Sequence, residues 1–217
     1  MHDKSLMKWG GICTFAAVIL FAAMLVINQV TGGLEWTAWI PFFSIFICLY
    51  VIVLLAANDY LSKTHYALAR IGSAFGLLLI VVLFAEVAAW GAHRMIQRSV
   101  STTAGAQLSP MLALFNSTHS LAIWFHGIWM GFWGAAFIRL PGKAKVTGVL
   151  MLLFALLYSI YYVLFRLGDA ALAELAHSSG HVAMLISHWL LGMLLLEASK
   201  VPPPPGALTR AGVGASE

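Results

Sequence analysis

Charged residues are scarce in this sequence: they make up 9% of its 217 residues, with 12 Lys and Arg against 8 Asp and Glu. Hydrophobic residues make up 61%, and the mean hydropathy is +0.91. A soluble fold has too little interior to bury that much apolar surface. The scarcity of charge therefore excludes a soluble domain and predicts an integral membrane protein.

Several motifs are also lacking. The two cysteines, Cys13 and Cys48, stand singly in separate apolar stretches with no C-x-x-C or zinc-ribbon spacing, and we interpret them as packing residues. No P-loop, G-x-S-x-G or dinucleotide-binding fingerprint occurs, and no internal repeat. The alternation of polar and apolar residues that is typical of a β-barrel is missing too. What remains is an all-α class of membrane protein.

Six stretches approach the roughly 20 mostly apolar residues that a spanning helix needs. They cover residues 11–30, 36–57, 71–90, 121–138, 146–165 and 182–196. The last is short, and we expect its helix to begin within the preceding histidine segment. The first is too long for a signal peptide and lacks a cleavage site, so we expect it to remain as an anchor. The sequence predicts a six-helix transmembrane domain over residues 1–200 and a disordered cytoplasmic tail, rich in Pro, Gly and Ala, over residues 201–217.

Basic residues predict the orientation of this bundle. With six spans, nine of the twelve Lys and Arg residues fall in segments on one side, and three, Arg94, Arg98 and Arg166, fall on the other. The positive-inside rule then predicts that both termini lie on the cytoplasmic side of the plasma (inner) membrane. The pI near 9.2 follows from this topology, so no nucleic-acid partner is expected.

Histidines gather on the predicted outer side. Six of the eight fall in the outer half of the membrane or at its outer surface. They are His93, His119, His126, His177, His181 and His188. Ionisable groups inside a membrane are costly and usually face a bundle interior or a wet cavity. The sequence therefore predicts a polar site enclosed by the third, fourth and sixth helices, with a polar interhelical network as the structural alternative.

The segment "HSSGHVAMLISHW" places three of these histidines on one narrow stripe. At about 100° per residue, His181 lies about 40° and His188 about 20° around the helix from His177. The deepest of them, His188, matches the depth of His126 on another helix. Two imidazoles at equal depth on facing helices could bind haem b, as in a membrane oxidoreductase that exchanges electrons with quinol or an outer carrier.

The pair His177 and His181 could instead chelate zinc or copper, with His119, His93, Glu86 or Asp169 completing the ligand set. This H-x-x-x-H spacing resembles that on the last helix of the membrane hydrolases related to alkaline ceramidases and adiponectin receptors. Those proteins typically have seven helices and an S-x-x-x-H on an early helix. Neither feature occurs here, so we do not assign the chain to that family.

Glu86 supports a third chemistry. It stands within "VVLFAEVAAW", seven residues before His93 and on the same helical face. A carboxyl group in apolar surroundings beside aromatic rings could donate a proton to an isoprenoid or lipid substrate. The structural alternative is a hydrogen bond from Glu86 to His119 or Tyr162.

Other polar and small residues are interpreted structurally. We expect Tyr158, Tyr161 and Tyr162 to anchor a helix at the outer interface. Gly127, Gly131 and Gly134 indicate a face for close helix packing. A compact bundle with short loops is also compatible with a non-catalytic accessory subunit of a larger membrane complex.

Overall fold

The structure is a computed structural model that describes the backbone of residues 3–31, 36–98 and 105–201. Within these ranges it describes all side chains except those at 28, 31, 36–39, 90, 93–98, 105–109, 111–113, 115 and 116. Five helices account for nearly all of the described backbone, and no strand occurs in it. They are α1 (Lys4–Thr31), α2 (Trp36–Arg98), α3 (Gly105–Phe137), α4 (Lys143–Leu167) and α5 (Ala170–Lys200). The all-α prediction is confirmed, whereas the predicted tail (residues 201–217) lies outside the described part except for Val201.

Four helical segments among the described residues are long and apolar enough to cross a membrane. They are Lys4–Ile27, Ile40–Ala89, Lys143–Leu167 and Ala170–Lys200. Large apolar side chains such as Ile19, Val81 and Leu156 lie on the outside of the protein. That exposure suits contact with lipid, since hydrocarbon tails solvate these side chains without cost.

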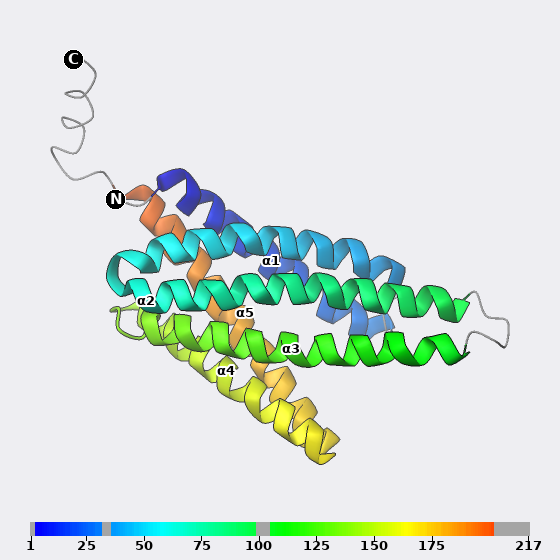
Figure 1. Ribbon diagram of the computed structural model, residues 1–217. Helices are drawn as coiled ribbons and strands as arrows, with labels where there is room; N and C mark the ends of the chain where they lie inside the picture. The colour runs from blue at the N-terminus through cyan, green and yellow to red at the C-terminus, as the bar shows by residue number, and fades with distance from the viewer. Residues whose placement is uncertain (1–2, 32–35, 99–104, 202–217) are drawn as a thin grey trace.

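Helix α2 is one long element that folds back on itself. Its backbone leaves helical geometry at His65 (φ −138°, ψ 56°), and Figure 1 shows the chain reversing direction there. The first arm (residues 36–64) then lies against the second arm (residues 66–98): the Ser73 hydroxyl donates to Asn58 Oδ1 at 3.0 Å. The predicted spans over residues 36–57 and 71–90 left residues 58–70 as the loop between two helices. In the structure these residues are helical on both sides of a single break at His65. Polar side chains do not prevent this, because they project from the helix and leave its backbone hydrogen bonds intact.

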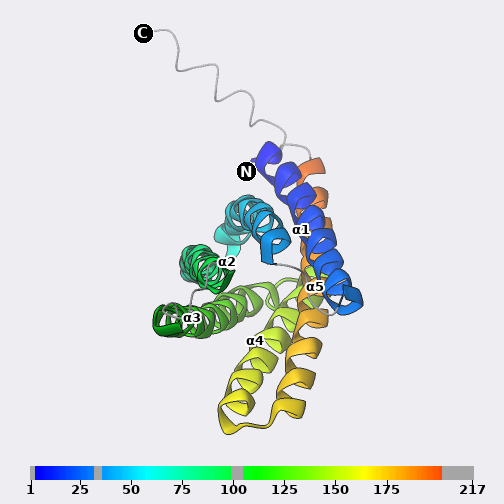
Figure 2. The same cartoon turned by 90° about the vertical axis from the view of Figure 1, so that its right-hand side faces the viewer.

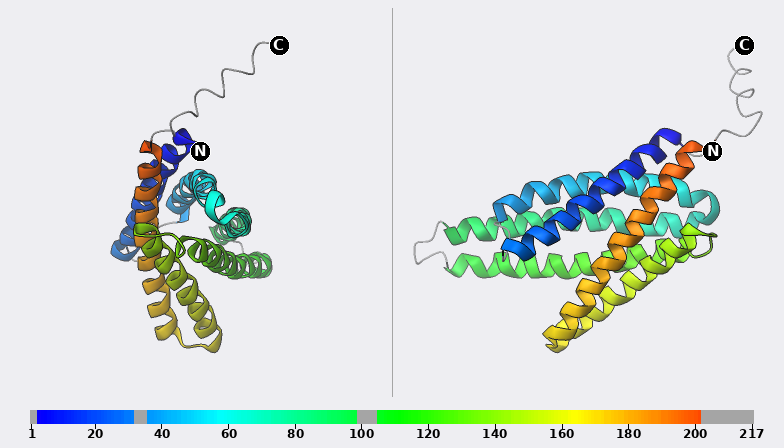
Figure 3. Two further views of the ribbon diagram at one scale, coloured as in Figure 1. Left: turned by 90° about the vertical axis from the view of Figure 1, so that its left-hand side faces the viewer. Right: turned by 180° about the vertical axis from the view of Figure 1, so that it is seen from behind.

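The helices contact one another in a closed order. Helix α1 packs on α2 and α5, α2 packs on α3, α3 on α4, and α4 on α5. Figure 2 shows α1 and α5 side by side, while the hairpin of α4 and α5 diverges from α2 and α3 toward its own turn; Figure 3 gives two further views. Side chains of α2, α3, α4 and α5 therefore meet in the centre of the bundle.

Short signals define the helix ends in the second half of the chain. Gly142 (φ +63°) precedes α4 and Gly168 (φ +83°) follows it, and both adopt backbone conformations that glycine accepts without strain. The Asp169 side chain then accepts a hydrogen bond from the Leu172 amide at 3.1 Å and caps α5. Helix α5 begins at Ala170, earlier than the start that the sequence predicted within the histidine segment, so that segment is helical throughout.

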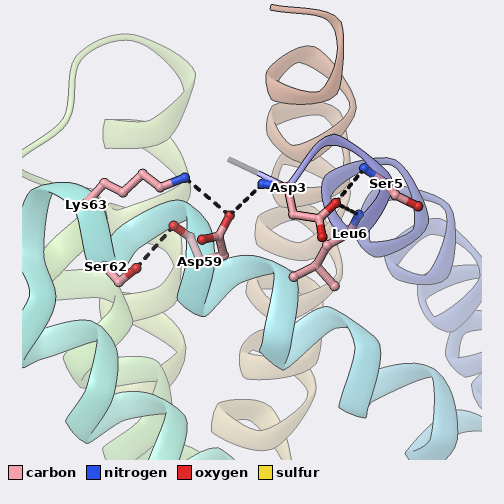
Figure 4. A network of polar contacts seen from close by, with 6 residues as sticks. All are labelled: Asp3, Ser5, Leu6, Asp59, Ser62 and Lys63. Carbon is pink, nitrogen blue, oxygen red and sulfur yellow. Dashed lines mark hydrogen bonds and ion pairs between the residues drawn. The ribbon is translucent and has the colours of Figure 1, made fainter. Parts of the chain in front are cut away.

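One end of the bundle is held by a polar network (Figure 4). Asp3 caps α1 by accepting hydrogen bonds from the Ser5 and Leu6 amides at 2.9 and 3.1 Å. Its own amide donates to Asp59 Oδ2 at 3.3 Å, and the Lys63 ammonium lies 3.4 Å from the same oxygen. This network connects the start of α1 to the bend of α2.

Candidate intramembrane histidine site

The predicted histidines come from the helices that surround the centre of the bundle. His119 and His126 lie on α3, and His177, His181 and His188 lie on α5. His93 belongs to the second arm of α2, and its side chain lies outside the described residues. His177 and His181 form an outer cluster near the α4–α5 turn, and His126 and His188 form a deep pair further along α3 and α5.

The outer cluster joins α4 to α5. The imidazole rings of His177 and His181 are 4.2 Å apart between centroids, as their i, i+4 spacing predicts. Tyr158 of α4 forms a 2.8 Å hydrogen bond between its hydroxyl and His181 Nε2. The ring of Tyr161 lies 4.5 Å from that of His177. One hydrogen bond and several ring contacts thus connect the side chains of this cluster across the helix pair.

Tyr158 differs from its prediction. We expected it to anchor α4 at the membrane interface, but its side chain is buried and faces His181, His126 and Phe154. The position of a tyrosine along a helix gives its depth but not its direction. The direction in which the Tyr158 side chain points depends on which helix packs beside α4. That helix is α5, and its His181 is the hydrogen-bond partner.

Glu86 and His119 form a separate pair between the second arm of α2 and α3. Glu86 Oε1 lies 2.8 Å from His119 Nδ1, and the two side chains are 16% and 43% exposed. This contact is one of the two structural alternatives that the sequence offered. The other, Tyr162, accepts hydrogen bonds from Arg166.

The deep pair consists of His126 and His188. His188 is 1% exposed, and its Nδ1 lies 2.9 Å from the Met184 carbonyl oxygen. A carbonyl oxygen only accepts, so Nδ1 carries the proton, and the neutral ring presents an unprotonated Nε2. That Nε2 is buried without a hydrogen-bond partner among the described residues, and so is Nε2 of His126.

Aromatic rings enclose this deep pair. Phe154 and Tyr158 of α4 lie 4.5 and 5.5 Å from the His126 ring, and Tyr50 of α2 lies 5.4 Å from the His188 ring. Trp129 contacts both histidines, at 5.4 Å from His126 and 6.1 Å from His188. The two imidazoles from α3 and α5 therefore share one aromatic environment.

Two indole N–H groups in the same region are also unpartnered. Nε1 of Trp129 and Nε1 of Trp133 are buried without acceptors in the described part of the chain, and their rings lie 5.1 Å apart. Leaving a buried polar group unpaired costs about 1–3 kcal/mol, and such groups usually indicate an ion, a water molecule or a ligand. Four of them in contiguous rings mark the centre of the bundle as the strongest candidate site.

The donor set can be tested against the cofactors that the sequence suggested. An imidazole whose Nδ1–H donates to a backbone carbonyl has the orientation that metal-ligating histidines usually have, so His188 fits an iron or copper ligand. A porphyrin does not fit beside His126, because Trp129, Phe154 and Tyr158 already pack on its ring. The hollow beside His188, next to Phe21, Phe46 and Tyr50, has no room for a water molecule.

The surface metal clamp remains a prediction. His181 Nε2 is already hydrogen-bonded to the Tyr158 hydroxyl, and His119 Nδ1 is hydrogen-bonded to Glu86 Oε1. Within the described residues, no group of three or more His, Cys, Asp or Glu side chains is arranged to hold a metal ion. The structure thus brings His177 and His181 together but does not add His119 to them.

Sequence reasoning missed Tyr50 and Trp129 as members of the site. Trp129 follows His126 by three residues, so helical spacing placed the two on one face. Tyr50 gave no comparable signal, since its contact with His188 joins residues from α2 and α5.

Comparison of the chain with protein-family models, with curated proteins and with solved structures gives no match.

Proposed function

We propose that this chain is a multi-pass protein of the plasma (inner) membrane with six spans and both termini in the cytoplasm. The spans would be α1, the two arms of α2, and α3, α4 and α5. The α2 bend, the α3–α4 turn, the start of α1 and the end of α5 lie at one end of the bundle, which supports a shared side for these segments (Figure 1). Reporter fusions after residues 102 and 143 test the topology: the first should report the outside and the second the cytoplasm.

The proposed activity is that of a membrane oxidoreductase with a metal centre held by His126 and His188. The observation that carries this proposal is the unpartnered Nε2 of His188, whose Nδ1–H is fixed by the Met184 carbonyl. A buried nitrogen lone pair with a fixed tautomer is prepared to bind an electrophile, and a metal ion is the usual one in proteins. The unpartnered Nε2 of His126, on α3, would be the second donor.

The bound metal would supply the change of oxidation state. The chain would hold it through two neutral imidazoles and surround it with Tyr50, Trp129, Phe154 and Tyr158, which exclude water. A bare copper or iron ion suits this ring packing better than haem b. A quinone from the bilayer or a carrier outside the membrane would be the electron partner.

The outer cluster would serve proton movement for this centre. Tyr158 lies between the two groups of histidines: its hydroxyl bonds His181 Nε2, and its ring contacts that of His126. His177, next to His181, lies nearer the α4–α5 turn. Imidazole and phenol groups can each donate and accept a proton, so these residues would carry protons between the α4–α5 turn and the deep pair.

The Glu86–His119 pair supports a second candidate function, acid–base chemistry on a lipid or isoprenoid. A carboxyl group and an imidazole 2.8 Å apart can exchange a proton, and both side chains are partly exposed at the bundle surface. This candidate needs no metal. It predicts that Glu86→Gln abolishes activity in a protein that contains neither metal nor haem.

Elemental analysis and the visible spectrum of purified protein test the main proposal. Wild-type protein should contain about one iron or copper per chain, and a Soret band would identify haem. His188→Leu and His126→Leu should remove the metal without loss of folded protein, because leucine suits a buried apolar site. The matched control His177→Ala, from the outer cluster, should retain it. Wild-type protein that contains no metal and binds none on addition would overturn the proposal.

A further inference from the structure

Helices α3 and α4 are close at one end and separate at the other. A Cβ added at Gly134 would lie 2.8 Å from Leu152 Cγ, and one at Gly148 would lie 2.4 Å from the Ile138 backbone nitrogen. A Cβ at Gly127 would meet only the Ala155 carbonyl oxygen, at 3.8 Å. The predicted close packing is therefore confirmed at Gly134 but absent at Gly127, because the helices have diverged there.

The separation leaves a cavity of about 150 Å³. Ile123, Gly127, Ile128 and Ala155 form its apolar wall. Trp124, Ser159 and Tyr162 complete the lining, and the Trp124 side chain is exposed at the edge. The cavity therefore opens toward the face of the bundle that lipid would contact.

A cationic group stands beside this cavity. Arg166 donates from Nε and from Nη2 to the Tyr162 hydroxyl, both at 3.2 Å, and its guanidinium carbon lies 5.3 Å from the Tyr162 ring centroid. A guanidinium has five N–H donors, so these two bonds leave others for an anion. Arg166 is exposed in the last turn of α4, toward the α4–α5 turn.

We propose that the cavity between α3 and α4 binds one anionic phospholipid of the surrounding leaflet. The phosphate would bind the Arg166 guanidinium and the Tyr162 hydroxyl, and part of an acyl chain would lie along Gly127 and Ala155. Charge complementarity identifies the occupant: an apolar cavity would accept any acyl chain, whereas an arginine at its polar end favours a lipid whose headgroup has a net negative charge. This site is independent of the deep histidine pair.

Native mass spectrometry of the full chain, purified in mild detergent and mixed with phosphatidylglycerol or phosphatidylcholine, tests this site. Wild-type protein should bind one phosphatidylglycerol in preference to phosphatidylcholine. Arg166→Gln should lower that preference by roughly tenfold, because it removes the charge-assisted contact. Gly127→Leu should reduce binding of both lipids, because its side chain fills the cavity.

Two variants are matched controls. Arg139→Gln removes a cation from the other end of the α3–α4 hairpin, and Ala16→Leu places a leucine at an exposed position on α1. Both should bind as wild type does. Equal affinity for the two lipids in wild-type protein would overturn the proposal, as would unchanged binding in Gly127→Leu. If Gly127→Leu lowers binding while Arg166→Gln leaves the preference for phosphatidylglycerol unchanged, Arg166 does not select the lipid and the proposal is wrong.

Discussion

Polar groups at the α2 bend have hydrogen-bond partners, whereas several polar groups at the centre of the bundle have none among the described residues. At the bend, Asp59 accepts from the Asp3 amide and pairs with Lys63, and Ser73 donates to Asn58. At the centre, Nε2 of His126 and of His188 lie buried without partners in the described structure. Folding alone accounts for the first arrangement, because its groups satisfy one another.

The second arrangement lowers stability unless something further binds. Buried polar atoms in native proteins are nearly always paired, and each exception needs a physical cause. At this centre the proposed cause is a metal ion, which would convert two unpaired lone pairs into two coordinate bonds. The predictions below use the difference between the two regions, beginning with the largest expected effect.

Substitution at the deep pair should have the largest effect on metal binding. His188→Ala removes one of two protein ligands, so affinity for the bound metal should fall by more than about 100-fold, beyond the 10–100-fold typical of losing an outer partner. Metal titration of wild-type and variant protein measures this. His181→Ala is the matched control on the same helix, and an equal loss in both variants would contradict the separate roles given to the two groups.

The apo form of His188→Leu should unfold at a higher temperature than the apo wild type. Leucine removes an unpaired buried nitrogen, whose burial costs about 1–3 kcal/mol. Thermal unfolding in detergent, with chelator present, gives the comparison. A lower unfolding temperature for the variant would mean that the wild-type nitrogen has a stabilising partner after all.

Tight and open parts of the α3–α4 contact should respond differently to the same substitution. Gly148→Leu places a side chain against the Ile138 backbone and should destabilise the protein by roughly 1–3 kcal/mol or prevent folding. Gly127→Leu meets open space and should change stability little. The yield of folded protein and its thermal unfolding measure both, and similar losses at the two glycines would contradict the divergence of the helices.

Loss of the Tyr158 hydroxyl should have a smaller effect. Tyr158→Phe removes the 2.8 Å bond to His181 and should lower stability by about 1 kcal/mol while metal content stays at the wild-type level. Proton uptake that accompanies metal reduction should become slower, because the phenol connects the outer cluster to the deep pair. Unchanged uptake kinetics would remove Tyr158 from the proposed path.

At the α2 bend the expected effect is the smallest. Asp59→Asn removes the charge that faces Lys63, in a pair whose side chains are about 30% exposed. Exposed ion pairs contribute at most about 1 kcal/mol, so stability should change by less than that and metal content should not change. Loss of metal in Asp59→Asn would mean that the bend affects the metal site, and it would contradict the separate roles given to the two regions.

The sequence predicted the helices more completely than their contacts. Each described helix contains at least one predicted apolar run, because such runs depend on nearby residues. However, α2 joins two of the runs, and α3 and α5 begin earlier than predicted. The break at His65 was not predicted, since several polar residues between positions 58 and 70 could equally have formed a loop. The bend is selected by how the two arms pack, which local sequence does not encode.

Part of the candidate site was predictable for the same reason. Helical periodicity placed His177, His181 and His188 on one stripe, and matching depth paired His188 with His126. Whether Tyr158 faces lipid or protein depends on the position of α5, and the role of Tyr50 depends on contact between α2 and α5. Glu86 and His119 were predicted only as one of several pairs, because their depth was known but their rotation about the helix axis was not.

X-ray absorption spectroscopy at the metal edge tests the central claim most directly. Protein loaded with copper or iron should show two imidazole nitrogens at about 2.0 Å from the metal, and both His126→Leu and His188→Leu should lose this signature while His177→Ala keeps it. A wild-type protein without bound metal, or a metal whose imidazole signature survives both leucine substitutions, would contradict the account.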